Sequence, residues 1–295
     1  MRAPRMIPLL TAIVEGGSQP VADDELSPPV PWWSLTKTAL AAGSLALVAA
    51  GRLALDTPVG SAAFTLRQLL QHTAGVPNYG ELAAYHEAVA RGEEPWPPDE
   101  LLRRVGSDRL LFEPGQGWAY SNVGYLFVRA IIEEAAGEDI GAALGRLVFV
   151  PLGVPGVRLA RAAKDLDATA WGNAAGYHPG WVYHGLAVGT PAEAALFLHR
   201  LMAGQLLPAA LLDAMRAPYP LGGPVEGRPW RTAGYGLGLM MDVTSPRGPC
   251  IGHTGQGPGS VAAAYHFPDF DPPRTVAAFA PVEDQAVVER AVLAL

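Results

Sequence analysis

The chain has 295 residues, of which 49% are hydrophobic and 17% are charged, a balance typical of a globular protein and not of a disordered one. The formal net charge is −7, and the 21 Lys and Arg residues are scattered, so the sequence predicts no nucleic-acid partner. The single cysteine, Cys250, excludes an intramolecular disulfide, and we expect its side chain to be buried.

The N-terminal residues allow two interpretations. Two arginines precede an apolar run over residues 7–14, as in a signal peptide, but no small-residue cleavage pattern follows. This favours a β-strand from Met6 to Val14 in a cytoplasmic protein; the alternative is an exported protein whose residues 1–22 are a signal peptide. The apolar stretch 38–51 is shorter than the about 20 residues that span a bilayer, so we expect a buried helix and no transmembrane segment.

Hydrophobic spacing, together with Gly and Pro, predicts the remaining elements in chain order. A short strand is expected at 19–22, followed by a proline-rich extended segment at 23–31. Helices are expected at 34–51, 65–72, 81–91, 98–105, 121–136, 140–149, 191–202 and 208–215, with loops at 53–60 and 171–185. Strands are expected at 234–243, 250–253, 260–267 and 274–280, and a closing helix at 283–295.

Strands therefore lie at both ends of the chain, with a helical block between them. We predict an α+β fold in which both chain ends form a central antiparallel sheet that is flanked by helices, with an inserted, mainly helical sub-domain. The α/β sub-domain would comprise residues 1–60 and 225–295, and the helical sub-domain residues 61–224. The active site would lie at their interface.

The first motif that carries chemistry is Ser34-Leu35-Thr36-Lys37. Spacing of i, i+3 at the start of a helix places Ser34 and Lys37 on one face, within reach of each other. A serine hydroxyl becomes a good nucleophile when a neighbouring base takes its proton, and a lysine serves as that base when burial lowers its pKa. The alternative is a helix-capping serine followed by a surface lysine.

Two further motifs follow downstream. Tyr120 and Asn122 stand at a loop-to-helix junction, where a phenol whose pKa is lowered by a lysine ammonium can shuttle a proton and an amide can orient a lysine. His253-Thr254-Gly255-Gln256 lies between two predicted strands, and the glycine allows another chain or a substrate close to the strand edge. Taken alone, the first motif also fits a packed tyrosine with a capping asparagine, and the second also fits a glycine-rich hairpin.

Several motifs in this order resemble the serine β-lactamase and penicillin-binding-protein superfamily, most of all its class C β-lactamases and family VIII esterases. Beyond Ser34–Lys37, the resemblance includes four stretches: Thr65 to Pro77, Phe112-Glu113-Pro114-Gly115 with Tyr120-Ser121-Asn122, Pro151-Leu152-Gly153, and His253-Thr254-Gly255. It implies the β-lactamase/transpeptidase-like fold already expected from the strand order.

The resemblance also implies roles. Ser34 would form an acyl-enzyme, with Lys37 as general base. Tyr120 would pass a proton to the leaving group, Asn122 would orient Lys37 or hold substrate, and His253 would line the pocket and tune the phenol of Tyr120.

Further residues would bind the substrate and its oxyanion. The backbone N–H groups of Ser34 and Gln256 would form an oxyanion hole, Thr254 and Gly255 would bind substrate, and Trp33 would narrow the pocket or form its wall. No metal or cofactor is implied, because the seven histidines show no ligand spacing.

The predicted function is a serine hydrolase that acts as an esterase or amidase on a small ester or amide. His253 stands where β-lactamases usually have Lys, and a neutral imidazole attracts the carboxylate of a β-lactam less strongly. The alternatives are a β-lactamase or D-alanyl-D-alanine carboxypeptidase, and a non-catalytic ligand-binding protein on the same fold. The sequence does not indicate an oligomeric state.

Overall fold

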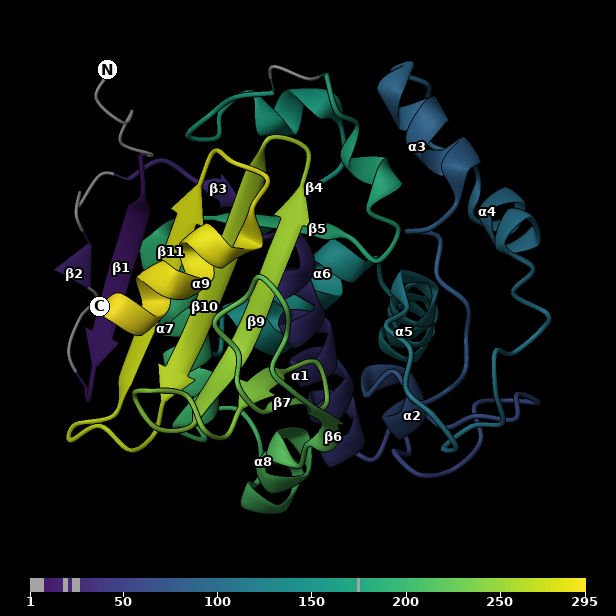
Figure 1. Ribbon diagram of the computed structural model, residues 1–295. Coiled ribbons are helices and arrows are strands. Elements are labelled where there is room, and N and C mark those ends of the chain that lie inside the picture. The colour runs from purple at the N-terminus through teal and green to yellow at the C-terminus, as the bar shows by residue number, and fades with distance from the viewer. Residues whose placement is uncertain (1–7, 18–20, 23–26, 174–175) are drawn as a thin grey trace.

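The computed structural model describes residues 8–17, 21–22, 27–173 and 176–295 (Figure 1). Parts of four predicted segments lie outside these residues: the beginnings of the two N-terminal strands, part of the proline-rich segment, and two residues of the loop 171–185. Among the described residues, no helix combines the length and the apolar character needed to cross a membrane.

The described residues form a main sheet of eight antiparallel strands in the order β2-β1-β11-β10-β9-β8-β7-β6. These strands are β1 (Leu10–Glu15), β2 (Val21–Ala22), β6 (Tyr219–Gly222), β7 (Ala233–Tyr235), β8 (Met240–Asp242), β9 (Cys250–Gly257), β10 (Ser260–Phe267) and β11 (Arg274–Ala280). Strand β1 pairs with β11, with Leu10 opposite Phe279 and Glu15 opposite Arg274. The prediction that both chain ends build one antiparallel sheet is therefore confirmed, as is a strand at residues 10–14.

A second, three-stranded sheet was not predicted from the sequence. Its strands are β3 (Val30–Pro31), β4 (Arg158–Ala160) and β5 (Leu186–Gly189), in the order β3-β5-β4. It joins the segment just before Ser34 to the middle of the chain, because Val30 pairs with Gly189 and Pro31 with Val188.

The helices follow the predicted order closely. They are α1 (Thr36–Ala49), α2 (Leu66–Leu70), α3 (Ala83–Ala90), α4 (Pro98–Val105), α5 (Asn122–Ala136), α6 (Ile140–Leu144), α7 (Pro191–Met202), α8 (Ala209–Arg216) and α9 (Gln285–Ala294). Shorter helical turns are η1 (Trp33–Leu35), η2 (Gly145–Phe149), η3 (Ala163–Leu166) and η4 (Pro179–Trp181). Where helices begin sharply, local chemistry explains it: Thr65 and Thr190 each form a capping box with a side chain three residues later.

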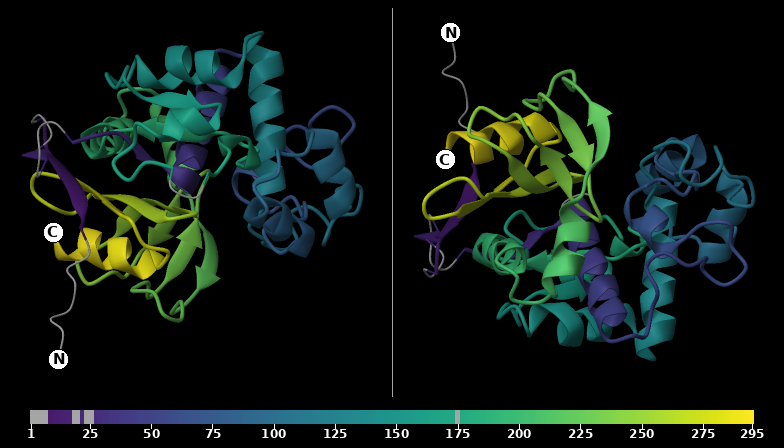
Figure 2. Two further views of the ribbon diagram at one scale, coloured as in Figure 1. Left: turned by 90° about the horizontal axis from the view of Figure 1, so that it is seen from above. Right: turned by 90° about the horizontal axis from the view of Figure 1, so that it is seen from below.

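Helices cover both faces of the main sheet (Figures 1 and 2). Helix α9 packs on β10 and β11 from one side, and α7 packs on β1, β10 and β11 from the other. Every residue of β10 is buried, as expected for a strand covered on both faces. Helix α1 is buried along most of its length and packs against α5, which places its first turn between the sheet and the helical region.

Several details of the predicted elements were wrong. The segment 234–243 is a hairpin of two strands, because Gly236 donates its N–H to the carbonyl of Leu239 and Gly238 turns the chain at φ +70°. The helix 140–149 divides into α6 and the wider turn η2. Strand β9 extends to Gly257, since its pairing with β10 continues through the glycines. The division into sub-domains at residues 60 and 224 stays a prediction.

Candidate active site

Ser34 lies at the junction between the two sheets and the first buried helix. It occupies the middle of the single turn η1, directly before α1, and is half-buried. The helix was predicted to begin at Ser34, but α1 begins at Thr36; Trp33 has φ +46°, a left-handed conformation that redirects the chain at this point. The turn nevertheless keeps the i, i+3 relation, and Lys37 Nζ lies 3.1 Å from Ser34 Oγ.

The side chain of Lys37 is enclosed, with 0% of its surface exposed. Its Nζ donates to Asn122 Oδ1 at 2.7 Å and lies 3.3 Å from His184 Nε2. The ring of Tyr120 also faces it, with its centroid 4.9 Å away. Burial lowers the pKa of the Lys37 amine well below its ordinary value of 10.5, because no carboxylate offsets the lost hydration. A neutral amine beside a serine hydroxyl has the properties of a general base.

Tyr120 reaches the site from the loop that leads into α5. Ser121 caps that helix by accepting the N–H of Gly124 at 2.9 Å, and its own N–H donates to His72 Nδ1 at 3.1 Å. These bonds hold the adjacent Tyr120, whose hydroxyl is hydrogen-bonded to Ser34. Burial raises the pKa of the Tyr120 phenol well above its ordinary value, which the bond to Ser34 and the charge of Arg228 only partly offset. The expectation that a lysine ammonium lowers this pKa was wrong, because Lys37 is buried and its own pKa is lowered.

Strand β9 passes directly beside the nucleophile. A Cβ added to Gly255 would lie 2.6 Å from Ser34 N and 2.7 Å from Trp33 Cβ, so only glycine fits at this position. Strand β8 pairs with β9 at residues 250–252, and no other described strand pairs with the same edge beyond Gly252. This leaves the edge near Gln256 facing η1. Ser34 and Gln256, which carry the two predicted oxyanion donors, both line the cavity at the nucleophile.

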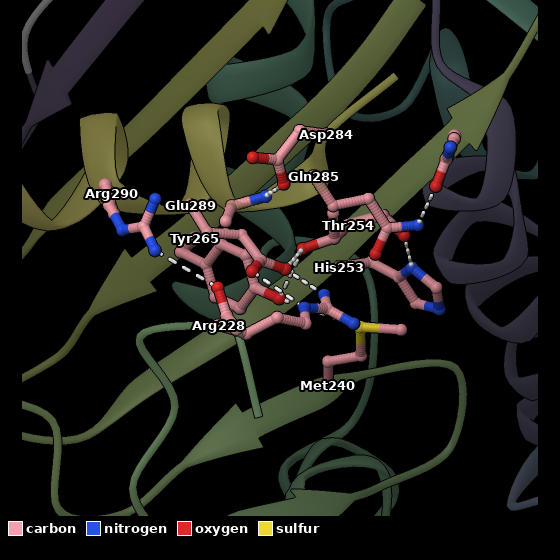
Figure 3. A network of polar contacts seen from close by, with 12 residues as sticks. Arg228, Met240, His253, Thr254, Tyr265, Asp284, Gln285, Glu289 and Arg290 are labelled. Carbon is pink, nitrogen blue, oxygen red and sulfur yellow. Dashed lines mark hydrogen bonds and ion pairs between the residues drawn. The ribbon is translucent and has the colours of Figure 1, made fainter. Parts of the chain in front are cut away.

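The side chain of Thr254 belongs to a buried polar network on the other side of β9. Its Oγ1 donates to Glu289 Oε1 at 2.7 Å and accepts from the Tyr265 hydroxyl at 2.9 Å. Glu289, which is 0% exposed, forms an ion pair with Arg228, whose Nε lies 2.8 Å from Glu289 Oε2 (Figure 3). Because Glu289 belongs to α9 and binds the hydroxyl of Thr254, this hydrogen bond anchors β9 to α9. The side chain of Thr254 is therefore directed away from Ser34.

His253 is also turned into the protein interior. Its Nδ1 donates to the carbonyl of Thr254 at 2.7 Å, and its Nε2 accepts from the Tyr235 hydroxyl at 2.9 Å. Burial, reinforced by Lys37, lowers the pKa of His253 to about 3, so the imidazole is neutral. Its side chain is fully buried and is not among the groups that line the cavity at Ser34. The predicted pocket-lining role does not match this position, because the ring is enclosed and bound to Tyr235 and to the carbonyl of Thr254.

A cavity of about 140 Å³ opens at the nucleophile. Its lining is mostly aromatic or small, and consists of Trp33, Ser34, Tyr79, Gly80, Tyr85, Asn122, Tyr177, Val182, His184, Gln256, Gly257 and Pro258. None of these side chains carries a formal charge at neutral pH, since burial lowers the pKa of His184 well below 6.5. The cavity therefore suits a neutral group.

Trp33 forms one wall of this cavity, as predicted. Its indole Nε1 donates to Ser260 Oγ at 2.9 Å, and its ring contacts Tyr177 edge-on with centroids 5.7 Å apart. Gly257 leaves room for the ring, because a Cβ there would lie 2.2 Å from it. A second cavity of about 240 Å³ adjoins the far side of Trp33 and is lined in part by Trp171. The predicted loop 171–185 thus supplies aromatic walls to both cavities.

Sequence reasoning missed two features of the site. His184 belongs to no motif, and it contacts Lys37 across 147 positions of sequence. The buried pair Arg228–Glu289 joins a loop to the last helix and left no local signal. Among the described residues, no group of three or more His, Cys, Asp or Glu side chains is arranged to hold a metal ion.

The fold and the Ser34–Lys37–Tyr120–Asn122 cluster define a protein of the serine β-lactamase and penicillin-binding-protein superfamily. The chain belongs to the Beta-lactamase family, whose family model matches residues 14–278.

Two curated relatives share parts of the sequence. The chain is 36% identical over 141 residues to Esterase EstB of Burkholderia gladioli, an alignment that covers 41% of this chain and 36% of that protein. It is 34% identical over 96 residues to Penicillin-binding protein 4* of Bacillus subtilis (strain 168), covering 32% of this chain and 21% of that protein. The matched region therefore spans well under half the length of these relatives.

Solved structures resemble the whole chain. A D-stereospecific amidohydrolase from Streptomyces sp. superposes with a TM-score of 0.77 at 22% identity, covering 98% of this chain and 93% of that one. The D-amino acid amidase from Ochrobactrum anthropi SV3 gives a TM-score of 0.76 at 22% identity, covering 97% and 95%. At this level of identity the likeness establishes the fold.

Proposed function

We propose that the protein is a serine hydrolase that cleaves small, uncharged esters or amides through an acyl-enzyme on Ser34. The observation that carries this proposal is the contact of 3.1 Å between Ser34 Oγ and the fully buried amine of Lys37. A lysine with a strongly lowered pKa has little structural use in a protein interior, since burying an amine costs free energy that an apolar residue would not. The same contact argues against a purely ligand-binding protein.

In the acylation step, Lys37 takes the hydroxyl proton of Ser34, and Ser34 Oγ forms a bond to the carbonyl carbon of the substrate. The backbone N–H groups of Ser34 and Gln256 stabilise the oxyanion. The bond from carbonyl carbon to leaving group then breaks, and the leaving oxygen or nitrogen receives a proton from the Tyr120 phenol. The Tyr120 phenol is protonated at neutral pH, and because burial raises its pKa, the phenolate left by this transfer is basic enough to take the proton of the Lys37 ammonium.

In the deacylation step, water attacks the same carbonyl carbon and gives one proton to a basic group of the site. The ester bond to Ser34 Oγ breaks, and Oγ recovers a proton. The products are the carboxylic acid and the free enzyme. Asn122 holds the Lys37 amine in both steps through the bond of 2.7 Å.

The preference for uncharged substrates rests on the lining of the cavity. No lysine or arginine lines it to bind a carboxylate, and the nearby Arg228 is already paired with Glu289. The alternative activities, on β-lactams or on D-alanyl-D-alanine peptides, both require recognition of a carboxylate. They remain the second candidate because Penicillin-binding protein 4* is a relative. The cytoplasmic location stays a prediction from the sequence.

Intact-mass measurement tests the proposal. The protein is exposed separately to a short-chain nitrophenyl ester, a fluorophosphonate and a β-lactam, alongside Ser34→Ala and the exposed-site control Ser61→Ala. We expect a fluorophosphonate adduct and ester turnover in the native protein and in Ser61→Ala, and neither in Ser34→Ala. Absence of both in the native protein contradicts a hydrolase, whereas faster turnover of the β-lactam than of the ester supports the second candidate.

A further inference from the structure

His184 belongs to no motif, yet one of its ring nitrogens lies within hydrogen-bond distance of the general base, Lys37. It lies in the stretch between η4 and β5, is 2% exposed, and lines the cavity at Ser34. Its Nε2 lies 3.3 Å from Lys37 Nζ. Its Nδ1 is buried and has no hydrogen-bond partner among the described residues.

The hydrogens on the Lys37 amine limit which of its polar neighbours can accept a hydrogen bond from it. A neutral primary amine carries two hydrogens and one lone pair, and Lys37 Nζ has three polar neighbours, namely Ser34 Oγ, Asn122 Oδ1 and His184 Nε2. The amide oxygen of Asn122 can only accept, so it takes one hydrogen. The lone pair must face the Ser34 hydroxyl for Lys37 to act as a base, which leaves the second hydrogen for His184.

We propose that His184 is a positioning residue for the hydrolytic step: its bare Nε2 accepts the second N–H of the Lys37 amine and thereby turns the lone pair toward Ser34 Oγ. This inference rests on the proposed function. It requires the imidazole to be neutral, with its proton on Nδ1. The opposite tautomer would donate from Nε2 into the lone pair of Lys37 and block the transfer from Ser34.

The surroundings of His184 agree with this role. Burial lowers its pKa well below the ordinary value of 6.5, and the charges that Lys37, His253, Arg129 and His72 can carry act in the same direction. A neutral imidazole adds no repulsion to protonation of the amine when Ser34 gives up its proton. No described group bonds to Nδ1, so among the described residues the amine of Lys37 is the group that selects the tautomer.

Two variants separate positioning from packing. In His184→Gln, the side-chain carbonyl can still accept from the amine, whereas in His184→Ala no acceptor remains and water can enter. We expect His184→Ala to lower the acylation rate with a nitrophenyl ester about tenfold to a hundredfold, with KM changed less than kcat. The acidic limb of the pH profile should move to higher pH, because water stabilises the ammonium of Lys37. His184→Gln should recover most of the rate and the native pH profile.

The matched control is His199→Ala, which removes a buried histidine that bonds to Thr275 and Gly16 and lines neither cavity beside Trp33. It should lower the thermal midpoint without moving the pH profile. A His184→Ala rate within twofold of the native rate, or equal losses in His184→Ala and His184→Gln, would overturn the proposal.

A second measurement does not depend on activity. Nitrogen-15 NMR of histidine side chains distinguishes a bare Nε2 from a protonated one, and His184→Gln identifies the signal of His184. We expect a protonated Nδ1 and a bare Nε2 at neutral pH. A protonated Nε2 would overturn the positioning role even if the enzyme is active. If the native protein hydrolyses nothing, the proposed function fails while this measurement still decides how His184 and Lys37 share their protons.

Discussion

Folding of this protein at neutral pH should release a proton from Lys37. The unfolded lysine has a pKa near 10.5, and burial lowers the pKa in the folded protein well below that value. The unfolded state therefore binds more protons than the folded state at every pH between the folded pKa and 10.5. The free energy of unfolding rises with pH by up to about 1.4 kcal/mol per pH unit from this one group, until the unfolded lysine also loses its proton near pH 10.5.

The substitution Lys37→Met isolates this contribution, because methionine is also unbranched and does not titrate. With a neutral Lys37 throughout, the native protein should gain about 2.7 kcal/mol of stability relative to Lys37→Met between pH 7 and pH 9. The variant also loses the hydrogen bonds of Lys37 to Asn122 and Ser34, each worth about 0.5–1.5 kcal/mol. That loss shifts the difference at every pH alike, so the slope is the quantity to test.

The assay is urea unfolding at pH 7, 8 and 9, followed by tryptophan fluorescence. The chain has one other lysine, Lys164, which is exposed, so Lys164→Met is the matched control. Its pH slope should equal that of the native protein. If the free energies of unfolding of the native protein and Lys37→Met change equally with pH, folding leaves the protonation of Lys37 unchanged, and the expected proton release is wrong.

Three further predictions concern the groups that frame the site. Gly255→Ala should reduce fluorophosphonate labelling of Ser34 at least tenfold, since the added Cβ would lie 2.6 Å from Ser34 N. The control Gly145→Ala, whose added Cβ would have no neighbouring atom within 4 Å, should be labelled like the native protein in the same intact-mass assay. Glu289→Gln, which leaves the Arg228 charge without its buried partner, should lower the free energy of unfolding in urea by about 3–5 kcal/mol. The control Glu100→Gln, in an exposed ion pair, should lower it by less than about 1 kcal/mol. Equal losses in the two variants would contradict a stabilising role for the buried carboxylate of Glu289. Burial lowers the pKa of the His253 imidazole to about 3, below its ordinary 6.5, so the free energy of unfolding falls as pH drops from about 6.5 toward 3. His253→Gln, which can still pair with its two neighbours, should reduce this pH dependence by up to about 1.4 kcal/mol per pH unit. An unchanged pH dependence of acid unfolding in the variant would contradict the prediction.

Elements with a clear apolar run or stripe between turn or capping residues were predictable from the sequence. The strands at 260–267 and 274–280 and the helix at 191–202 match the structure residue for residue. Their apolar residues face a core, and their ends carry turn or capping residues. The three-stranded sheet was missed because two of its strands have only two and three residues, too short to show a period.

The site residues were likewise predictable only where a local sequence pattern marks them. Ser34, Lys37, Tyr120 and Asn122 were found because each belongs to a motif, and the structure brings all four together. The direction of a side chain is a different question, because it depends on partners distant in sequence. Thr254 points away from the nucleophile because Glu289 binds it, whereas the ring of His253 is held by Tyr235 and does not line the cavity at Ser34. Neither partner was identifiable from the sequence alone.

The most direct test of the account is the titration of the Lys37 amine itself. In Lys164→Arg, Lys37 is the sole lysine, so carbon-13 labelling at lysine Cε gives one NMR signal to follow from pH 6 to pH 11. We expect the chemical shift of a neutral amine at pH 8, with no transition near 10.5 while the protein is folded. A single transition near 10.5 would show that Lys37 is an ammonium at neutral pH and would contradict its role as the base for Ser34.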